Sequence, residues 1–131
     1  MASIFSKIVA GEIPSYKVAE NDQFLAFLDV FPLKRGHTLV IPKKEVDSIF
    51  DLDEETYLGL MAFSKKVAAA IQRSISCNRI SVHVIGLEVP HAHVHLIPIN
   101  TMSDCDFSKT KLKLSAEEFT EIARSISGNM K

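Results

Sequence analysis

The stretch that most constrains the fold is VPHAHVHLIPIN, residues 89–100, because histidines and apolar residues alternate in it. Successive side chains of a β-strand point to opposite faces, so His91, His93 and His95 would all project from one face of a strand. Alanine, valine and leucine stand between and after them, which favours a hydrophobic core behind the other face. The segment therefore predicts a strand that is buried on one face and presents three imidazoles to solvent on the other.

Three uses of this row follow from the chemistry of imidazole. A structural role needs a partner for each ring nitrogen, because an unpaired buried polar atom costs free energy. A metal site would use two neighbouring histidines with His37 or Glu88. Such a metal site would leave the third histidine without a role, because His91 and His95 would lie about 13 Å apart along a strand. Nucleophilic catalysis would use all three, with one neutral ring attacking phosphorus and its neighbours donating hydrogen bonds.

Turn residues and apolar periodicity predict an α+β fold with a largely antiparallel sheet. A short helix is expected in residues 3–12, with Ser3 as its cap and Gly11 at its end. The expected strands are residues 16–20 and 23–30, which form a hairpin, then 37–42, 79–85 and the histidine segment. A strictly alternating βαβ arrangement is disfavoured, because only one long helix separates strands.

Two helices are predicted from capping-box patterns. Asp51 with Glu54 opens a long helix whose apolar spacing continues to residues 74–78. Ser115 with Glu118 opens a second helix near the C-terminus. Its inward-facing residues are expected to be Phe119, Ile122, Ala123 and Ile126.

Composition narrows the classes of partner. The chain has 131 residues, 47% of them apolar and 24% charged, which fits one globular domain. Its 15 basic and 16 acidic residues nearly cancel, which argues against a nucleic acid held by backbone electrostatics. No signal peptide and no apolar stretch of about 20 residues is present, so no membrane partner and a cytoplasmic location are expected. Cys77 and Cys105 match no metal-ligand spacing and are expected to be reduced thiols.

Two segments resemble the histidine triad (HIT) superfamily. HAHVHLI, residues 91–97, matches the pattern His-x-His-x-His followed by two apolar residues. FLDVFPLKRGHTLVIPK, residues 27–43, resembles the family segment with an Asp or Asn, a proline, Gly-His, an apolar strand and Pro-Lys. The opening SIFSKIVAGEIP is similar to the start of Hint-like members. The resemblance covers roughly residues 3–99 and leaves 100–131 as a C-terminal helical extension, within one HIT domain spanning 1–131.

The resemblance implies an α+β sheet that continues across a homodimer, and an enzyme without a cofactor or a catalytic metal. The implied reaction is hydrolysis or transfer at the α-phosphate of purine nucleoside monophosphate conjugates, such as phosphoramidates, through a nucleotidyl-histidine intermediate. His93 would be the nucleophile, His95 would contact the phosphate or the leaving group, and His91 and His37 would support the row. A dinucleoside polyphosphate hydrolase and a nucleotide-binding module with little catalysis are the alternatives.

The resemblance also implies a nucleotide site. Asp29 would bind the ribose hydroxyls, since a carboxylate accepts from a diol. The remaining nucleotide-binding residues are expected to be Phe5, Ile8 and Phe27 around the base, together with Glu88, Val89 and His83. For the three apolar residues, a role in the hydrophobic core is an equal alternative. The alternative for Glu88 is a loop carboxylate that accepts hydrogen bonds from the backbone. The alternative for His83 is an ordinary strand histidine without a role in binding.

The chain departs from the family pattern at its start and before the histidine row. Ser3 and Ser6 stand where some members carry a Cys-x-x-Cys half of a zinc site, so a structural zinc is not expected. Leu87 stands where many members have a glutamine that contacts the phosphate or the leaving group, and leucine cannot hydrogen-bond. The preferred leaving group and the preferred purine stay open.

Overall fold

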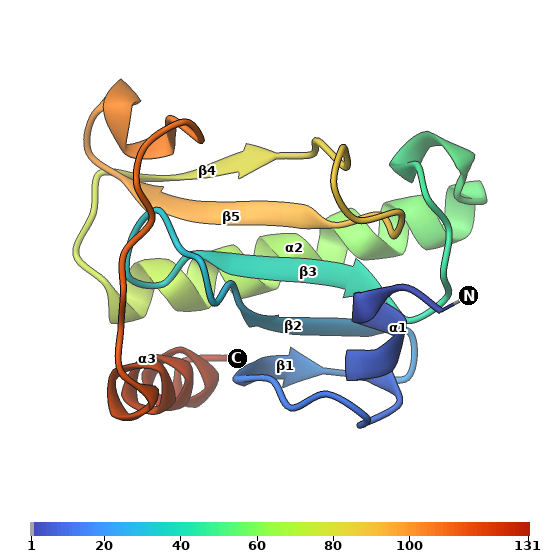
Figure 1. Ribbon diagram of the computed structural model, residues 1–131, viewed down its shortest axis with the longest axis horizontal. Coiled ribbons are helices and arrows are strands. Elements are labelled where there is room, and N and C mark those ends of the chain that lie inside the picture. The colour runs from blue at the N-terminus through green and yellow to red at the C-terminus, as the bar shows by residue number, and fades with distance from the viewer. Residues whose placement is uncertain (1) are drawn as a thin grey trace.

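A computed structural model describes residues 2–131 of the chain (Figure 1). In chain order the elements are α1 (Ile4–Val9), β1 (Lys17–Glu20), β2 (Phe24–Leu28), β3 (Thr38–Pro42), the 3-10 helix η1 (Ile49–Asp51), α2 (Glu54–Ser74), β4 (Arg79–His83), β5 (Val94–Ile99), the 3-10 helix η2 (Met102–Cys105) and α3 (Ala116–Gly128). Within the described part of the chain, no helix is long and apolar enough to cross a membrane.

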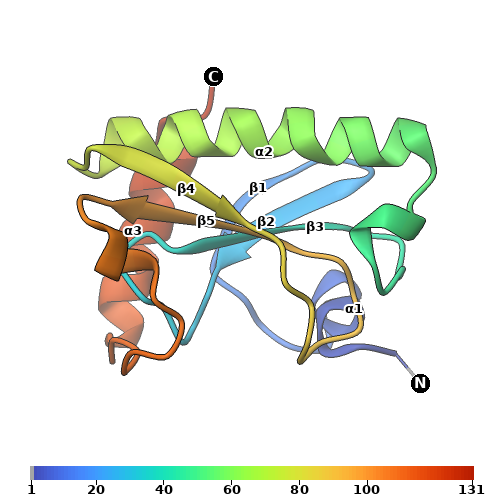
Figure 2. The same ribbon diagram turned by 90° about the horizontal axis from the view of Figure 1, so that it is seen from above.

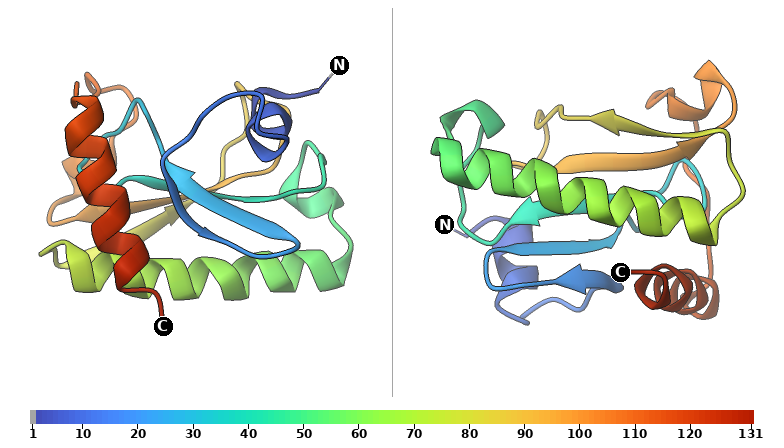
Figure 3. Two further views of the ribbon diagram at one scale, coloured as in Figure 1. Left: turned by 90° about the horizontal axis from the view of Figure 1, so that it is seen from below. Right: turned by 180° about the vertical axis from the view of Figure 1, so that it is seen from behind.

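The five strands form one antiparallel sheet in the order β1-β2-β3-β5-β4. The α+β class and the largely antiparallel sheet are therefore confirmed. Helix α2 lies along one face of the sheet. Helix α1 and the irregular segment between β4 and β5 lie on the other face (Figure 2). Helix α3 packs against α2 and the edge strand β1 (Figure 3).

Both faces of the central strands are buried. In β2, Phe24, Ala26 and Leu28 join the larger core under α2 and α3, and the alternate residues Leu25 and Phe27 join a smaller core under α1. Alternation of side chains across the strand explains the division. The smaller core is completed by Phe5, Ile8, Leu39 and Ile41. It forms an apolar floor on the face of the sheet that also carries the histidines.

The long helix begins two residues later than predicted. Its N-cap is Asp53, whose side chain accepts from the Thr56 amide, and Asp51 is instead the last residue of η1. Asp53 has the extended backbone that an N-cap requires, whereas Asp51 is already inside a helical turn. The capping box of Ser115 and Glu118 is confirmed. The buried residues of α3, Phe119, Ile122, Ala123 and Ile126, are those predicted.

The histidine strand is shorter than predicted. Strand β5 begins at Val94, so His91 and His93 lie in the bend before it. The Ala92 amide donates to the carbonyl of Val46, at 2.7 Å, instead of to β3. Pairing with β3 stops because Pro42 has no amide hydrogen, and its carbonyl oxygen accepts from the His91 ring. The bend turns His91 away from the direction that a continuous strand would give it.

Gly36, which leads into His37, provides a test of this packing. Its φ is +92°, and a Cβ there would overlap Cδ1 of Ile75. Gly11 has a φ of +81° with nothing within 4 Å of a built Cβ. We expect Gly11→Ala to lower the free energy of unfolding by about 1–2 kcal/mol through left-handed strain alone. Gly36→Ala should cost at least about 1 kcal/mol more, because Ile75 must also move. Urea denaturation of both variants measures the difference, and equal losses would contradict it.

Candidate active site

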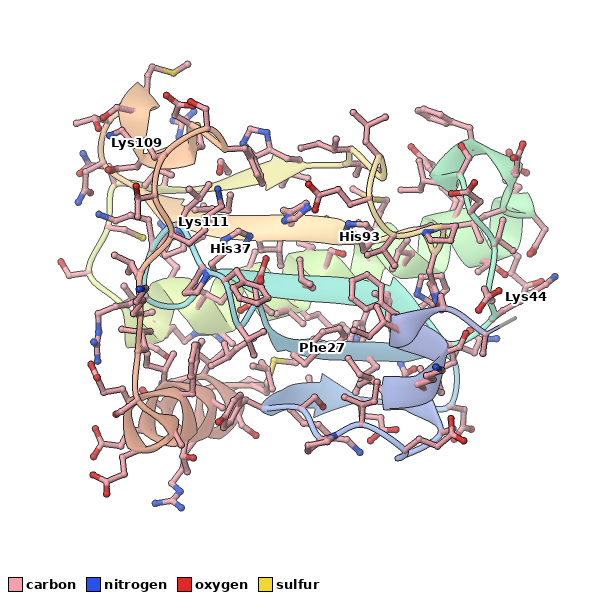
Figure 4. All side chains as sticks on the ribbon, viewed as in Figure 1. Phe27, His37, Lys44, His93, Lys109 and Lys111 are labelled. Atoms are coloured by element: carbon pink, nitrogen blue, oxygen red, sulfur yellow. The ribbon has the colours of Figure 1, made fainter. Side chains whose placement is uncertain are left out.

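A cavity of about 490 Å³ lies on the face of the sheet that carries the smaller core under α1, because Phe5, Phe27 and Leu39 of that core line it. Figure 4 shows the labelled side chains of Phe27, His37, His93 and Lys111 on this face. The predicted site residues that line the cavity are Phe5, Ile8, Phe27, Asp29, His37, Glu88, Val89, His93 and His95. His91 and His83 do not line it.

A hydrogen bond to the backbone determines the tautomer of the neutral His93 ring. Its Nδ1 lies 2.7 Å from the carbonyl oxygen of His91. A carbonyl oxygen only accepts, so Nδ1 carries the hydrogen and Nε2 of the neutral ring carries the lone pair. The ring is 7% exposed and packs edge-on against Phe5, with ring centroids 5.0 Å apart. His93 therefore offers a nucleophilic nitrogen held in one tautomer.

A second chain of hydrogen bonds sets the tautomer of His95. The Leu33 amide donates to Nδ1 of His37 over 3.0 Å, so the hydrogen of the neutral His37 ring is on Nε2. That Nε2 lies 2.9 Å from Nδ1 of His95, which must accept. The remaining hydrogen of His95 is then on Nε2, where it is a donor. The centroids of the His93 and His95 rings are 5.1 Å apart, so a lone pair and an N–H donor stand side by side.

His91 has a structural position. It is fully buried, its Nε2 lies 2.7 Å from the Pro42 carbonyl oxygen, and its Nδ1 accepts from the Ser3 hydroxyl at 2.8 Å. Glu45 accepts from the Ser3 amide and from the Ser6 hydroxyl. The two serines are thus used in holding α1 to the bend before β5. Hydroxyls engaged in this way do not fit a zinc site, which takes thiolate, imidazole or carboxylate ligands.

Burial favours the neutral form of His37, His91 and His95. The expectation of a solvent-exposed row is wrong, because His91, His93 and His95 are all under 9% exposed. Burial, together with the neighbouring His95, lowers the pKa of His37 to about 3. Burial and the neighbouring His93 lower the pKa of His95 to about 4. The row folds inward because each ring has a partner within the protein, which removes the cost of burying it.

Asp29 stands at the end of β2, beside His37. One carboxylate oxygen accepts from the Phe31 amide at 2.9 Å, and the other lies 3.6 Å from Nε2 of His37. Burial raises the pKa of Asp29. Asp29, His37 and His95 bring one ligand atom each within 4.8 Å of one another. A metal ion there would have to displace the hydrogen that His37 donates to His95.

His83 lies at the end of β4, across from His95 in the sheet. Its Nε2 is buried without a hydrogen-bond partner, and its ring packs edge-on against Phe107 at 5.3 Å. Phe107 and Lys111 line the cavity and were not predicted. Both lie beyond the segment that resembles a family, where no motif marks them. Alternation or spacing could not reveal them, because they belong to an irregular stretch between η2 and α3.

The profile of the HIT domain matches residues 10–102, which include His37, the bend with His93, and His95 in β5. The chain belongs to the HIT family. The sheet with long α2 and C-terminal α3 is accordingly the α+β HIT fold.

An uncharacterised HIT-like protein of Borreliella burgdorferi is 38% identical over 135 residues, covering 97% of each chain. An adenosine 5'-monophosphoramidase of Schizosaccharomyces pombe is 34% identical over 133 residues, covering all of both chains. Among solved structures, a HIT-like protein of Bartonella henselae superposes with a TM-score of 0.84 at 32% identity, covering 97% of this chain and 95% of that one.

The buried histidines predict a loss of stability in acid. The folded-state pKa values of about 3 and about 4 at His37 and His95 lie below the ordinary value of 6.5. Between these values the unfolded chain binds more protons than the folded chain, so the free energy of unfolding falls as the pH drops. The loss should begin near pH 6.5 and reach up to about 1.4 kcal/mol per pH unit for each histidine. Urea denaturation between pH 7.5 and 5 measures this slope.

The matched variant is His37→Asn, because an asparagine keeps an acceptor for the Leu33 amide and does not titrate. Its slope with pH should be shallower than that of the original protein, whatever its stability at pH 7.5. Equal slopes would show that His37 does not resist protonation in the folded state.

Proposed function

We propose that this HIT protein is a nucleotide hydrolase or transferase that acts on the α-phosphate of purine nucleoside monophosphate conjugates through a nucleotidyl-His93 intermediate. The observation that carries the proposal is the pair of fixed tautomers: a lone pair on Nε2 of His93 beside an N–H on Nε2 of His95. Attack on phosphorus needs the first, and a negatively charged phosphoryl oxygen is stabilised by the second.

In the first step, the lone pair of His93 Nε2 forms a bond to phosphorus. The bond from phosphorus to the leaving group breaks, its electron pair goes to the leaving atom, and a leaving amine takes a proton from solvent as the bond breaks. The His93 ring is then a cation whose Nδ1–H still donates to the His91 carbonyl. Water next attacks phosphorus, the nitrogen–phosphorus electrons return to His93, and the surplus proton goes to the leaving group or to solvent. A nucleoside monophosphate is released.

The cavity has suitable groups for the rest of the nucleotide. Asp29 lines the cavity and would accept from the ribose hydroxyls, and the apolar side chains of Phe5, Ile8 and Phe27 would contact a planar base. Glu88 and Val89 also line the cavity. The S. pombe relative is named an adenosine 5'-monophosphoramidase, which makes phosphoramidates the first substrates to test. Dinucleoside polyphosphates present the same α-phosphate and are the second class.

Substitution of His93 tests the proposal. His93→Ala should lower kcat for adenosine 5'-phosphoramidate by at least about 1000-fold, because no other group supplies the attacking nitrogen. Binding of AMP, measured by calorimetry, should change far less, since Phe5, Phe27 and Asp29 still line the cavity. Rapid quenching of the original protein with labelled substrate should trap a nucleotide attached to the protein and none on the variant. Full turnover by His93→Ala would disprove the proposed intermediate.

We also propose that two copies pair through β4, the exposed edge of the sheet. Val82, Val84 and Ile85 on and after this strand are 52%, 41% and 46% exposed, and an apolar edge strand invites pairing with another chain. A two-fold axis beside β4 would continue the sheet into the second copy. The site described above lies within one chain, so this proposal and the chemistry stand separately. A cytoplasmic location stays a prediction.

The dimer is tested by charge at this edge. Val82→Glu should convert the protein to a monomer in light scattering coupled to size exclusion, because two buried carboxylates would face each other across the axis. Thr120→Glu, on the exposed surface of α3 at the far side of the sheet, adds the same charge and should leave the mass unchanged. A Val82→Glu protein that keeps the mass of its parent, or a parent that is already a monomer, would exclude pairing through β4.

A further inference from the structure

Residues 106–112, here called the strap, cross one end of the cavity. The strap follows η2 and ends where the Leu112 amide donates to the Pro32 carbonyl over 2.8 Å. Before it, Asp104 lies 3.5 Å from the Lys34 ammonium. Pro32 and Lys34 belong to the loop between β2 and β3, which also provides the Leu33 amide for His37. The strap is therefore fixed to the same loop that orients the His37–His95 pair.

Phe107 of the strap packs on the histidines of the site. Its ring centroid lies 5.0 Å from that of His95 and 6.2 Å from that of His37, both in edge-on arrangements. It also contacts His83. Phe5 of α1 packs on His91 and His93 from the opposite end of the row. The cavity thus has two ends, one against α1 and one against the strap, with His93 and His95 between them.

Lys111 is the cation of the strap end. Its Nζ donates to the carbonyl oxygens of Phe107 and Lys109, at 2.5 Å and 3.0 Å, and an ammonium has a third N–H to offer. Lys111 lines the cavity and is half-buried. Burial raises the pKa of Asp29, and the positive charge of Lys111 opposes that rise. Burial lowers the pKa of His37, and the charge of Lys111 adds to that fall. In Figure 4 Lys111 lies beside His37, while Lys109 lies at the margin of the molecule.

This layout gives a bound conjugate a direction. A base against Phe5 and Phe27 places the α-phosphate near His93, so the group on the far side of phosphorus extends past His95 toward the strap. At the strap end, the side chains that line the cavity include the ammonium of Lys111 and the half-buried ring of Phe107. A positive charge in a partly buried site attracts an anion more strongly than the same charge in water.

We propose that Lys111 is a specificity-determining residue that binds an anionic leaving group, such as a phosphate chain, beyond the α-phosphate. The proposal rests on the proposed function and names its leaving-group class. Leu87, which takes the place of a polar residue on the cavity wall, is 90% exposed and cannot donate a hydrogen bond. Lys111 supplies a donor and a charge from a different element of the chain.

The protonation of His95 supports the same class of leaving group. A neutral His95 donates a hydrogen bond from Nε2 but gives up that hydrogen reluctantly, because its loss would leave an imidazolate anion whose Nδ1 accepts from His37. A phosphate chain leaves as a stable anion and needs no proton at the moment the bond to phosphorus breaks. A departing amine does need one. An ammonium beside the leaving group therefore suits a departing phosphate chain better than a departing amine.

A different role for Lys111 would run through Asp29. If the ammonium only keeps that carboxylate ionised for the ribose, then every nucleotide substrate would depend on Lys111 to the same extent. A test must therefore compare substrates that share the nucleoside and the α-phosphate and differ only in the leaving group.

The experiment measures kcat/KM of the full chain for diadenosine tetraphosphate and for adenosine 5'-phosphoramidate. Lys111→Met should lower the value for the tetraphosphate by roughly ten- to a hundred-fold, the size of a lost charge-assisted hydrogen bond. For the phosphoramidate the loss should be at least about five-fold smaller. Lys111→Arg should retain most of the preference, since it retains the charge. Lys109→Met removes the same charge from the strap outside the cavity and should shift neither substrate appreciably.

Equal losses on both substrates would overturn the proposal in favour of the role through Asp29, and no loss on either would overturn it outright. Neither result touches the proposed function, which fails only if His93→Ala retains turnover or if the original protein cleaves neither conjugate. In that last case the assignment of Lys111 fails with it. A Lys111→Met protein that melts more than about 10 °C below its parent is replaced by Lys111→Gln for the same comparison, with the same outcomes.

Discussion

The hydrogen bond from the Leu33 amide to Nδ1 of His37 is the contact on which the site depends. It places the hydrogen of His37 on Nε2, which makes Nδ1 of His95 an acceptor and Nε2 of His95 a donor. Without it both rings could exchange tautomers, and His95 could present a lone pair to a phosphoryl oxygen that carries negative charge. The Leu33 amide, which lies in the loop between β2 and β3, thus determines through His37 that Nε2 of His95 is a hydrogen-bond donor.

Burial adds a second constraint that acts in the same direction. A solvated imidazole titrates near neutral pH and would be partly cationic, whereas burial lowers the pKa of His37 and His95 far below that range. The rings can be buried because the backbone provides partners for them: the carbonyl of Pro42 for His91, the carbonyl of His91 for His93 and the amide of Leu33 for His37. The fold therefore orients these rings mainly through peptide groups, whose carbonyls are kept by every substitution and whose N–H is lost only in a substitution to proline.

This dependence on the backbone explains what the sequence could and could not predict. Hydrophobic alternation and helical spacing predicted the antiparallel sheet and the buried face of α3, because those patterns follow from burial alone. Several residues that line the cavity, among them Asp29, His37 and His93, were named from the sequence because they lie in the segments that resemble the family. The burial of the histidines was not predicted, because it depends on which carbonyls come close in space. The start of α2 was misplaced by two residues, since Asp51 and Asp53 are both good capping residues and the 3-10 turn η1 decides between them.

Phe107 and Lys111 escaped prediction for a different physical reason. They lie in an irregular strap whose position is set by three weakly patterned contacts: the Leu112 amide on Pro32, Asp104 near Lys34, and a phenyl ring on His95. None of these contacts needs a particular residue spacing, so no periodic pattern in the sequence marks the strap. The loop with Pro32 and Leu33 serves both parts, since it holds the strap on one side and orients His37 on the other. In this fold the tautomer of His93 depends on the bend before β5, whereas the strap end of the cavity depends on a separate set of contacts.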